Sequence, residues 1–511
     1  MDKYLPTIGL EIHAELKTKS KMFCSCANNP DEDTPNANIC PICLGHPGTL
    51  PVLNHEAIKS VLKIGVAVNG KLADFTEWDR KNYFYPDIPK GYQISQYAYP
   101  LVSGGNLAGV ELERIHLEED TAQSTHDTHE KSLVNFNRSG VPLMELVTTP
   151  TIHDAKTAVA FAKELQLLLR YLGAGEANME KGEMRVEANI SVSLKDQEPS
   201  NKNQANQKSE IKKLGTKTEV KNLNSFRAVE GAIAHEIERQ IKLLEAGEKV
   251  KQETRGWDDK AEETYSQRSK ESSHDYRYFP DPDIPKLKIS EIPEFSKEKL
   301  LDDIKDENGS IDLPWVRRER FKKDFGATDK EAEMFVDDDK GLLTKYFEAI
   351  IGRTKSIRLV LNYLLTDYLG LLKKVHGLES INHLDTIKPE HFAELIDMIN
   401  AGDVSSSGAK KILSLQLAVV DEKEGMRQAS PASPASPRII AEKNGLIQKS
   451  NASDIEPAID KVITDNAAVV AEYKAGKAAS LQFLIGQAMK ATKGAGNPAV
   501  VKELLIKKLA L

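Results

Sequence analysis

Four cysteines lie within one short window of the sequence, and the rest of the chain contains none. They form two closely spaced pairs, Cys24 with Cys26 and Cys40 with Cys43, separated by thirteen residues. Two such pairs can supply four thiolates to a tetrahedral zinc ion, and a site with four protein ligands has no open position for a substrate. We therefore expect a structural zinc ion here, and the alternative is four reduced cysteines that hold no metal.

Two other segments place charged side chains on one face of a strand. In residues 7–17 apolar and polar residues alternate strictly, so Glu11 and His13 point away from the apolar side, about 7 Å apart. Residues 184–192 repeat this pattern. Their polar face carries Arg185, Glu187 and Asn189. A face that only meets water usually carries Lys, Thr, Ser and Gln, so these side chains predict a binding site.

A third group of carboxylates comes at the end of a predicted strand over residues 110–119. Carboxylates and a histidine on one open face suit one or two magnesium ions that hold phosphate groups. Alternation places Glu118 on this face, but alternation often fails at a strand end, so the choice between Glu118 and Glu119 stays open. For any single carboxylate the alternative is a side chain that is merely solvated.

Residues 78–96 combine cationic and aromatic side chains. Arg80, Lys81 and Lys90 can offset negative charge that develops on a transferring phosphoryl group. The aromatic residues can stack on a base; they are Tyr83, Phe84, Tyr85 and Tyr92. The alternative is an aromatic loop, interrupted by prolines, that packs on the core.

Common nucleotide-binding loops are missing from the sequence. It contains neither the phosphate-binding G-x-x-x-x-G-K-[ST] pattern nor the dinucleotide-binding G-x-G-x-x-G turn. Ser405 to Ser407 precede a predicted helix, so we expect them to cap that helix rather than to act as nucleophiles. Any use of a nucleotide would therefore depend on the polar face of the sheet and its metal ions.

The sequence predicts an α+β protein of several domains. Its 511 residues are too many for one hydrophobic core. Up to about residue 290 strands prevail, and alternation also indicates strands at 132–138 and 216–223. Helices over 154–172 and 225–246 are expected to cover the packed side of an antiparallel sheet. Beyond Pro285 the chain is expected to be helical.

Composition narrows the class of protein further. The net charge of −8 argues against a protein that coats nucleic acid with its whole surface, but residues 470–511 hold seven lysines and two glutamates. No apolar run approaches the roughly 18 residues of a membrane span, and the N-terminus does not resemble an export signal. We therefore expect a cytoplasmic protein. Residues 196–213 are expected to form a polar loop, and 427–438 a linker.

Long ordered stretches of the chain resemble the B subunits of the Asp/Glu-tRNA amidotransferases. They include IGLEIHAELKTKSKMFC, CPICLGHPGTLPVLN, WDRKNYFYPDIPKGYQISQ, HLEEDTAQSTH, FNRSGVPLMELVTTP, MEKGEMRVEANISV and HDYRYFPDPDIP, and they are spread over nearly the whole sequence. The resemblance implies a glutamine-synthetase-like cradle over 1–293, a helical domain over 294–404 and a YqeY-like tail domain over 405–511 that binds tRNA.

The resemblance also implies a reaction and partners. ATP would phosphorylate the side-chain carboxylate of Glu-tRNA(Gln) or Asp-tRNA(Asn), and ammonia from the amidase, which is the A subunit of the complex, would displace the phosphate. The product is Gln-tRNA(Gln) or Asn-tRNA(Asn), in a heterotrimer that also contains a small C subunit. Such an enzyme is a carbon–nitrogen ligase with glutamine as amido donor, and which of the two tRNAs is used stays open.

Matching positions in the family motifs imply roles for individual residues. The implied magnesium and ATP group, with catalytic roles, consists of Glu11, His13, Glu118 or Glu119, and Glu187, with Glu119 counted among the metal ligands. The implied substrate and ATP contacts are Arg80, Lys81, Tyr83, Tyr85, Lys90, Arg185 and Asn189. The four cysteines match the zinc-bearing members, and the implied tRNA contacts are Lys490, Lys493 and Lys502.

Two segments depart from the family pattern, namely 196–213 and the Ser/Pro/Ala-rich linker. Neither contains a proposed catalytic residue. The competing interpretation is a tRNA-binding scaffold without catalysis. The charged face argues against it, because an inactive site would be expected to lose these charges.

Overall fold

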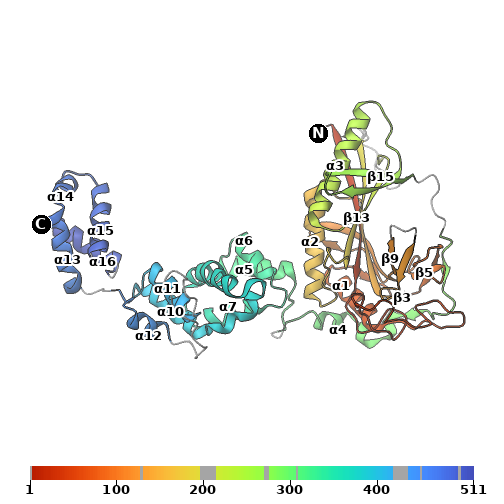
Figure 1. Ribbon diagram of the computed structural model, residues 1–511, viewed down its shortest axis with the longest axis horizontal. Helices are drawn as coiled ribbons and strands as arrows, with labels where there is room; N and C mark the ends of the chain where they lie inside the picture. The colour runs from red at the N-terminus through yellow and green to blue at the C-terminus, as the bar shows by residue number, and fades with distance from the viewer. Residues whose placement is uncertain are drawn as a thin grey trace, which may run out of the picture. The chain divides into compact units, whose positions relative to one another are not determined.

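The computed structural model describes residues 3–126, 131–195, 214–269, 276–306, 309–417, 436–448, 452–492 and 496–510. Two compact units divide the chain, Met1–Val316 and Arg317–Leu511. The first is mixed α+β and the second is helical over its described residues (Figure 1). The insertion predicted over 196–213 lies outside the described residues. Within those residues, no helix combines the length and apolar character needed to cross a membrane.

A ten-stranded sheet forms the centre of the first unit. Its five central strands, in spatial order, are β13 (Thr218–Leu223), β12 (Met184–Leu194), β1 (Tyr4–Glu15), β11 (Pro142–Thr148) and β8 (Val110–Glu119). The outer strands are β14 (Glu253–Asp258), β15 (Glu263–Ser269), β6 (Val102–Ser103), β2 (Lys71–Leu72) and β7 (Asn106–Leu107). Each pair among the five central strands is antiparallel, as predicted, whereas β13 pairs in parallel with the next strand outward, β14. The strand predictions for 7–17, 184–192, 110–119 and 216–223 are confirmed, whereas β11 was not predicted.

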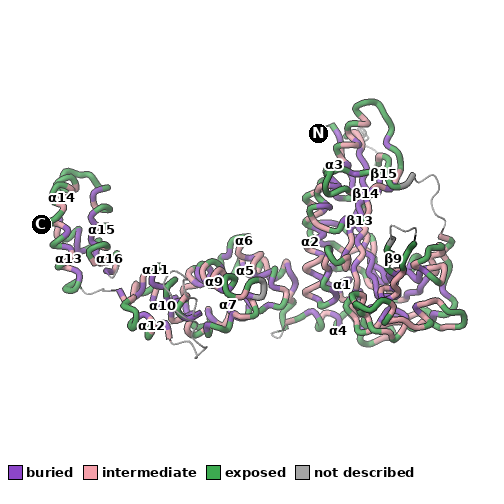
Figure 2. The backbone as a smooth tube through the Cα atoms, viewed as in Figure 1, coloured by how far each residue is buried: buried purple, intermediate pink, exposed green. Residues whose placement is uncertain are grey.

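Helices cover one side of this sheet, as the alternating patterns predicted. Helix α2 (Ala155–Tyr171) begins after Asp154, whose side chain caps it, and α3 (Phe226–Glu245) begins after the capping Ser225. Their apolar side chains join those of β1 and β12 in one hydrophobic core, to which α1 (His55–Ala67) also contributes. Figure 2 shows the buried residues concentrated along these strands. The other side of the sheet is left for polar side chains.

Smaller strand pairs flank the main sheet. Strands β4 (Asp79–Asn82), β5 (Tyr92–Ser95) and β16 (Phe279–Pro280) form a three-stranded sheet, and β4 and β5 contain Arg80, Lys81 and Tyr92 of the predicted cationic and aromatic segment. The strand predicted at 132–138 is observed as β10 (Ser132–Asn135), which pairs with β9 (Gln123–His126). Strands β3 (Phe75–Thr76) and β17 (Leu287–Lys288) form a further pair. Helix α4 (Lys297–Asp302) packs against α1.

The second unit contains two separate hydrophobic clusters. The first spans α5 (Pro314–Phe325), α6 (Asp329–Val336), α7 (Leu342–Ile351), α8 (Ile357–Asn362), a π-helical turn (Tyr363–Tyr368), α9 (Leu369–His376), α10 (Pro389–Ala401), α11 (Ser406–Gln416) and α12 (Pro437–Lys443). The second joins α13 (Ala452–Asp465), α14 (Ala467–Lys474), α15 (Ala479–Ala491) and α16 (Pro498–Leu509).

Two local predictions can be compared with these helices. Ser405 caps α11 by accepting a hydrogen bond from the Gly408 amide at 3.1 Å, as expected. Residues 427–435 of the predicted linker lie outside the described residues. Helix α12 begins at Pro437, so the last two residues of the predicted linker, Pro437 and Arg438, are helical. Proline suits the first turn because its missing N–H has no partner to lose there.

Candidate active site and metal centre

The register of the central strands gathers charged side chains on the face of the sheet that the helices leave open. Strand β1 pairs with β12 so that Glu11 lies opposite Glu187, and it pairs with β11 so that His13 lies opposite Glu145. Strand β8 adds His116 opposite Glu145. Residues directly opposite each other in a ladder lie on the same face. We call this surface the acidic face.

Distances around His13 define the centre of the acidic face. Its Nε2 lies 3.4 Å from Glu145 Oε2, 3.6 Å from Glu118 Oε1 and 3.9 Å from Glu11 Oε1. Two sets of potential metal ligands result, each with its donor atoms within 4.8 Å of one another. The first set is Glu11, His13 and Glu145, and the second is His116, Glu118 and Glu145. Glu145 belongs to both, so its carboxylate could bridge two cations.

Burial and mutual repulsion perturb the titration of this group. Burial, together with the charges of Glu145 and Glu187, raises the pKa of Glu11 to about 7. Burial alone would lower the pKa of His13, but the hydrogen bond to Glu145 and the surrounding carboxylates raise it to about 9. Despite burial, His116 and His13 hold the pKa of Glu145 below its ordinary value. Such a concentration of negative charge fits divalent cations.

Two lysines partly balance the acidic face. Lys221 on β13 lies with its Nζ 2.7 Å from Glu187 Oε2 and 3.4 Å from Glu219 Oε1. Burial opposes the charge of Lys81, but Glu118 raises the pKa of this lysine above its ordinary value. The Lys81 ammonium also lies 5.2 Å from the ring centroid of Tyr276. Both lysines are therefore cationic beside the carboxylates.

The structure separates Glu118 from Glu119. Glu118 turns to His13 and also accepts a hydrogen bond from the Ser95 hydroxyl at 3.2 Å. Glu119 turns the other way, where its Oε1 accepts a bond from the Ile94 amide at 2.9 Å and pairs with Lys90. Among the described residues Glu119 belongs to neither set of potential metal ligands. Alternation thus continues to the strand end, and Glu118 is the carboxylate on the acidic face.

Arg185 and Asn189 lie on β12 with different surroundings. Arg185 joins a compact ion cluster in which its Nη2 lies 3.2 Å from Asp120 Oδ1. Arg138 donates from Nε to Asp120 at 2.8 Å and to Glu15 at 3.1 Å in the same cluster. The side-chain oxygen of Asn189 is buried, and no hydrogen bond reaches it from the described residues. The oxygen of Asn189 is therefore a buried acceptor without a partner among the described residues.

The cationic and aromatic segment is only partly directed at the acidic face. Arg80 donates from Nε to Asp281 at 2.8 Å, and its guanidinium lies 4.3 Å from the ring centroid of Tyr92. Tyr83 packs edge-on against Tyr276, with ring centroids 6.1 Å apart. Tyr85 is exposed. Arg80 therefore has protein partners of its own, whereas Lys81 adjoins the carboxylates.

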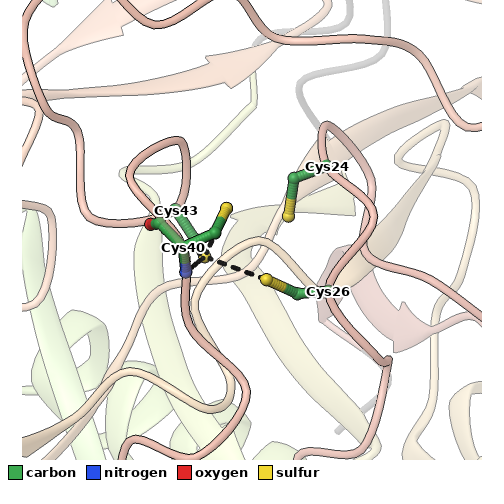
Figure 3. A group of neighbouring side chains, drawn as sticks. All are labelled: Cys24, Cys26, Cys40 and Cys43. Atoms are coloured by element: carbon green, nitrogen blue, oxygen red, sulfur yellow. Dashed lines mark hydrogen bonds between the residues drawn. The ribbon is translucent and has the colours of Figure 1, made fainter.

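The four cysteines lie together, as their spacing predicted. Figure 3 shows Cys24 and Cys26 facing Cys40 and Cys43, with the sulfur atoms turned toward one another. The Sγ of Cys43 lies 3.8 Å from that of Cys26 and 3.6 Å from that of Cys40. Tetrahedral zinc with bonds of about 2.3 Å requires sulfur atoms about 3.8 Å apart. The donor set therefore fits zinc.

One sulfur of this centre is held in its anionic form. The hydrogen bond from Cys24, followed by the nearby charge of Lys21, lowers the pKa of Cys43 to about 4, although burial opposes the shift. The Cys40 amide also donates to the Cys43 sulfur at 3.1 Å. A thiolate is the form of cysteine that binds metal.

Two of the three predicted tRNA contacts can be placed. Lys490 near the end of α15 and Lys502 in α16 are both exposed. Lys493 lies outside the described residues. Exposed lysines can contact phosphates without reading a base sequence.

Three residues of the acidic face were not predicted from the sequence: Glu145, His116 and Lys221. The signal for Glu145 was available, because a lone carboxylate interrupts the apolar run of β11. Lys221 follows from the alternation of β13, where it shares a face with Glu219.

Comparison with known proteins agrees with this arrangement. A family model described as the GatB/GatE catalytic domain matches residues 6–293, and one described as the GatB domain matches residues 345–509. Two relatives, each named as the B subunit of an aspartyl/glutamyl-tRNA(Asn/Gln) amidotransferase, cover nearly the whole chain. That of Thermodesulfovibrio yellowstonii is 40% identical over 99% of both chains, and that of Carboxydothermus hydrogenoformans is 37% identical over 100% of both. The chain therefore belongs to the family of aspartyl/glutamyl-tRNA amidotransferase B subunits.

Proposed function

We propose that this chain uses ATP to phosphorylate the side-chain carboxylate of Glu-tRNA(Gln) or Asp-tRNA(Asn) and then replaces the phosphate with ammonia. The observation that carries the proposal is Glu145, shared by two sets of potential metal ligands on the open face of the sheet. Family membership supports the substrates, because the relatives' names contain both aspartyl and glutamyl.

Activation is required because a carboxylate is a poor electrophile whose leaving group would be oxide. Transfer of the γ-phosphoryl group forms an acyl phosphate, and ADP departs. Ammonia then forms the new C–N bond at the carbonyl carbon while the C–O bond to phosphate breaks. Magnesium, when bound, would offset the charge of the transferring phosphoryl group.

We assign the magnesium ligands from the two sets. Glu11, His13 and Glu145 would hold one ion, and His116 and Glu118 would hold a second together with the same Glu145. This assignment replaces Glu119 by Glu118 and adds Glu145 to the predicted group. The contribution of Glu187 would be electrostatic, through its position opposite Glu11.

Cations and donors around the face would bind the anionic substrates. Lys81 adjoins Glu118 and is suited to a phosphate or carboxylate oxygen, whose charge it would balance. Asn189 lies two residues from Glu187 on β12, on the same face of the strand, and its amide group could hydrogen-bond a substrate amine or hydroxyl group. Arg185 is held by Asp120, and its remaining N–H groups could serve the same substrates.

The remaining parts of the proposal concern assembly. We propose that an amidase, the A subunit, supplies ammonia from glutamine and that a small C subunit is the third member of a cytoplasmic heterotrimer. The cradle would span 1–293, the helical domain 294–404 and the YqeY-like tail 405–511. Exposed Lys490 and Lys502, with Lys493, would contact tRNA phosphates, and the cysteines would hold structural zinc.

A complex reconstituted from this chain with its A and C subunits tests the proposal. We expect Glu145→Gln to lower tRNA-stimulated ATP cleavage and amidated tRNA formation, with ammonium as donor, by about 100-fold or more, because both cation positions lose a ligand. The matched control is Glu113→Gln, since Glu113 is an exposed carboxylate on the same β8 strand. Full activity of the Glu145 variant would refute the metal assignment. A wild-type complex that binds both tRNAs but never cleaves ATP would favour a scaffold.

A further inference from the structure

The side chain of Lys21 is fully buried, with 0% of its surface exposed. Its Nζ donates to two backbone carbonyls, Asn38 O at 2.8 Å and Phe136 O at 3.1 Å. No carboxylate among the described residues pairs with this ammonium. A buried charge without a counter-ion is costly, because carbonyl dipoles replace only part of the lost hydration.

The four-cysteine centre adjoins Lys21 on several sides. The Lys21 amide donates to Cys26 O at 3.0 Å, and Asn38, which accepts from Nζ, lies two residues before Cys40. A Cβ atom built at Gly140 would lie 3.6 Å from Lys21 Cδ and 3.9 Å from Cys43 Cβ. The side chains of Lys21 and Cys43 therefore both lie next to Gly140. Lys21 therefore adjoins both cysteine pairs.

The negative charge of a zinc–thiolate centre would account for the position of the buried Lys21 side chain. Four thiolates with one Zn²⁺ carry a net charge of −2. Among the contacts of the described residues, no arginine or lysine side chain, including that of Lys21, donates directly to a cysteine sulfur, so Lys21 would act through its charge and not through a hydrogen bond to sulfur. We propose that the buried ammonium of Lys21 is the charge-balancing residue of the zinc–thiolate centre and stabilises the bound metal. The proposal rests on zinc occupancy of the cysteines, which the experiment measures separately.

Metal release from the full-length protein is the test. Zinc content is measured first by elemental analysis, and the rate of release to a chromogenic chelator is then compared among variants. Lys21→Gln removes the charge but keeps a hydrogen-bond donor, and Lys21→Met removes both. We expect both to release zinc about 10- to 100-fold faster than wild type, the range typical of residues that support metal ligands.

Lys63 offers a matched control. It is a partly buried lysine on α1 whose Nζ donates to one carbonyl, Leu172 O, at 2.9 Å. We expect Lys63→Met to release zinc at the wild-type rate. Release from Lys21→Gln at the wild-type rate would overturn the charge-balancing role, whereas wild-type protein without stoichiometric zinc would overturn the zinc centre and the role of Lys21 with it.

Thermal unfolding distinguishes charge balance from a purely structural role. If Lys21 only satisfies carbonyls, Lys21→Met should lower Tm equally in zinc-loaded and zinc-stripped protein. Charge balance predicts a larger loss of Tm in the loaded protein, because the four thiolates of the zinc-bound centre carry more negative charge than the cysteines of the stripped protein. Equal losses of Tm in the two forms would overturn the proposal.

Discussion

The imidazole of His13 provides a quantitative test of the acidic face. Its side chain is largely buried, and three carboxylates lie within 4 Å of its Nε2, so the imidazolium form is favoured in metal-free protein. A group whose pKa is higher in the folded than in the unfolded state stabilises the protein, and this stabilisation is fully present when the pH is below the pKa of the unfolded state. That stability is lost as the pH rises through the folded value.

For His13 this stability is lost between pH 6.5 and about 9, and the difference between the two pKa values corresponds to about 3 kcal/mol of unfolding free energy. Glu11 acts with the same sign at lower pH, because burial raises its pKa from 4.5 to about 7. Metal-free protein should therefore lose stability continuously as the pH rises from 4.5 to 9. Magnesium should reverse this trend, because it binds the unprotonated forms of both groups.

Calorimetry of the full chain in magnesium-free buffer checks this prediction. The stability difference between wild type and His13→Gln should shrink by about 3 kcal/mol between pH 6.5 and 9. His153→Gln serves as control, because His153 is exposed and its ring hydrogen-bonds the Pro6 carbonyl, with no carboxylate paired to it among the described residues. The increase in wild-type Tm that magnesium causes should become larger as the pH rises from 6.5 to 9. A stability difference that stays constant with pH would show that His13 is not enclosed by carboxylates.

Three further predictions concern other parts of the chain. Lys221→Met should destabilise magnesium-free protein by about 1 kcal/mol in denaturant titrations, because the carboxylates it pairs with lose their cation, and adding Glu187→Gln should restore part of the loss. Replacing Lys490 and Lys502 by alanine should weaken tRNA binding and reduce the slope of log K against log salt by about 1 to 2, with tRNA-independent ATP cleavage unchanged. Leu146→Ala should cost about 2–5 kcal/mol of stability, because Leu146 is fully buried in the core of the first unit, and an unchanged denaturation midpoint would contradict the packing of β11.

Strands with one packed face were predictable because apolar and polar side chains alternate along them. Residues 7–17 and 184–192 show this pattern, and the structure pairs them as neighbouring strands β1 and β12. Their register was not predictable, because no local pattern specifies that Glu11 lies opposite Glu187. Strand β11 was missed for a related reason: it is buried on both faces, so its sequence is almost continuously apolar.

Side-chain direction at strand ends and in irregular segments was harder to predict. Glu118 points to the acidic face, as alternation indicated. Glu119 is excluded from that face by its bonds with the Ile94 amide and Lys90, and the sequence does not show these bonds. Arg80 was expected to face a phosphoryl group, and the structure pairs it with Asp281, a residue about 200 positions away. Local sequence carries no information about so distant a partner.

The loop over residues 136–140 connects the two candidate metal sites. Phe136 O accepts from buried Lys21, Ser139 donates to Cys43 O at 3.3 Å, and Arg138 reaches Asp120 and Glu15. The cysteine centre and the edge of the acidic face thus both make hydrogen bonds with the loop over residues 136–140. In evolution these features should change together: a lineage that lost the cysteines would retain a buried charge at position 21 with nothing to balance it. We therefore expect substitution of this lysine to accompany cysteine loss, and loop residues to change with both.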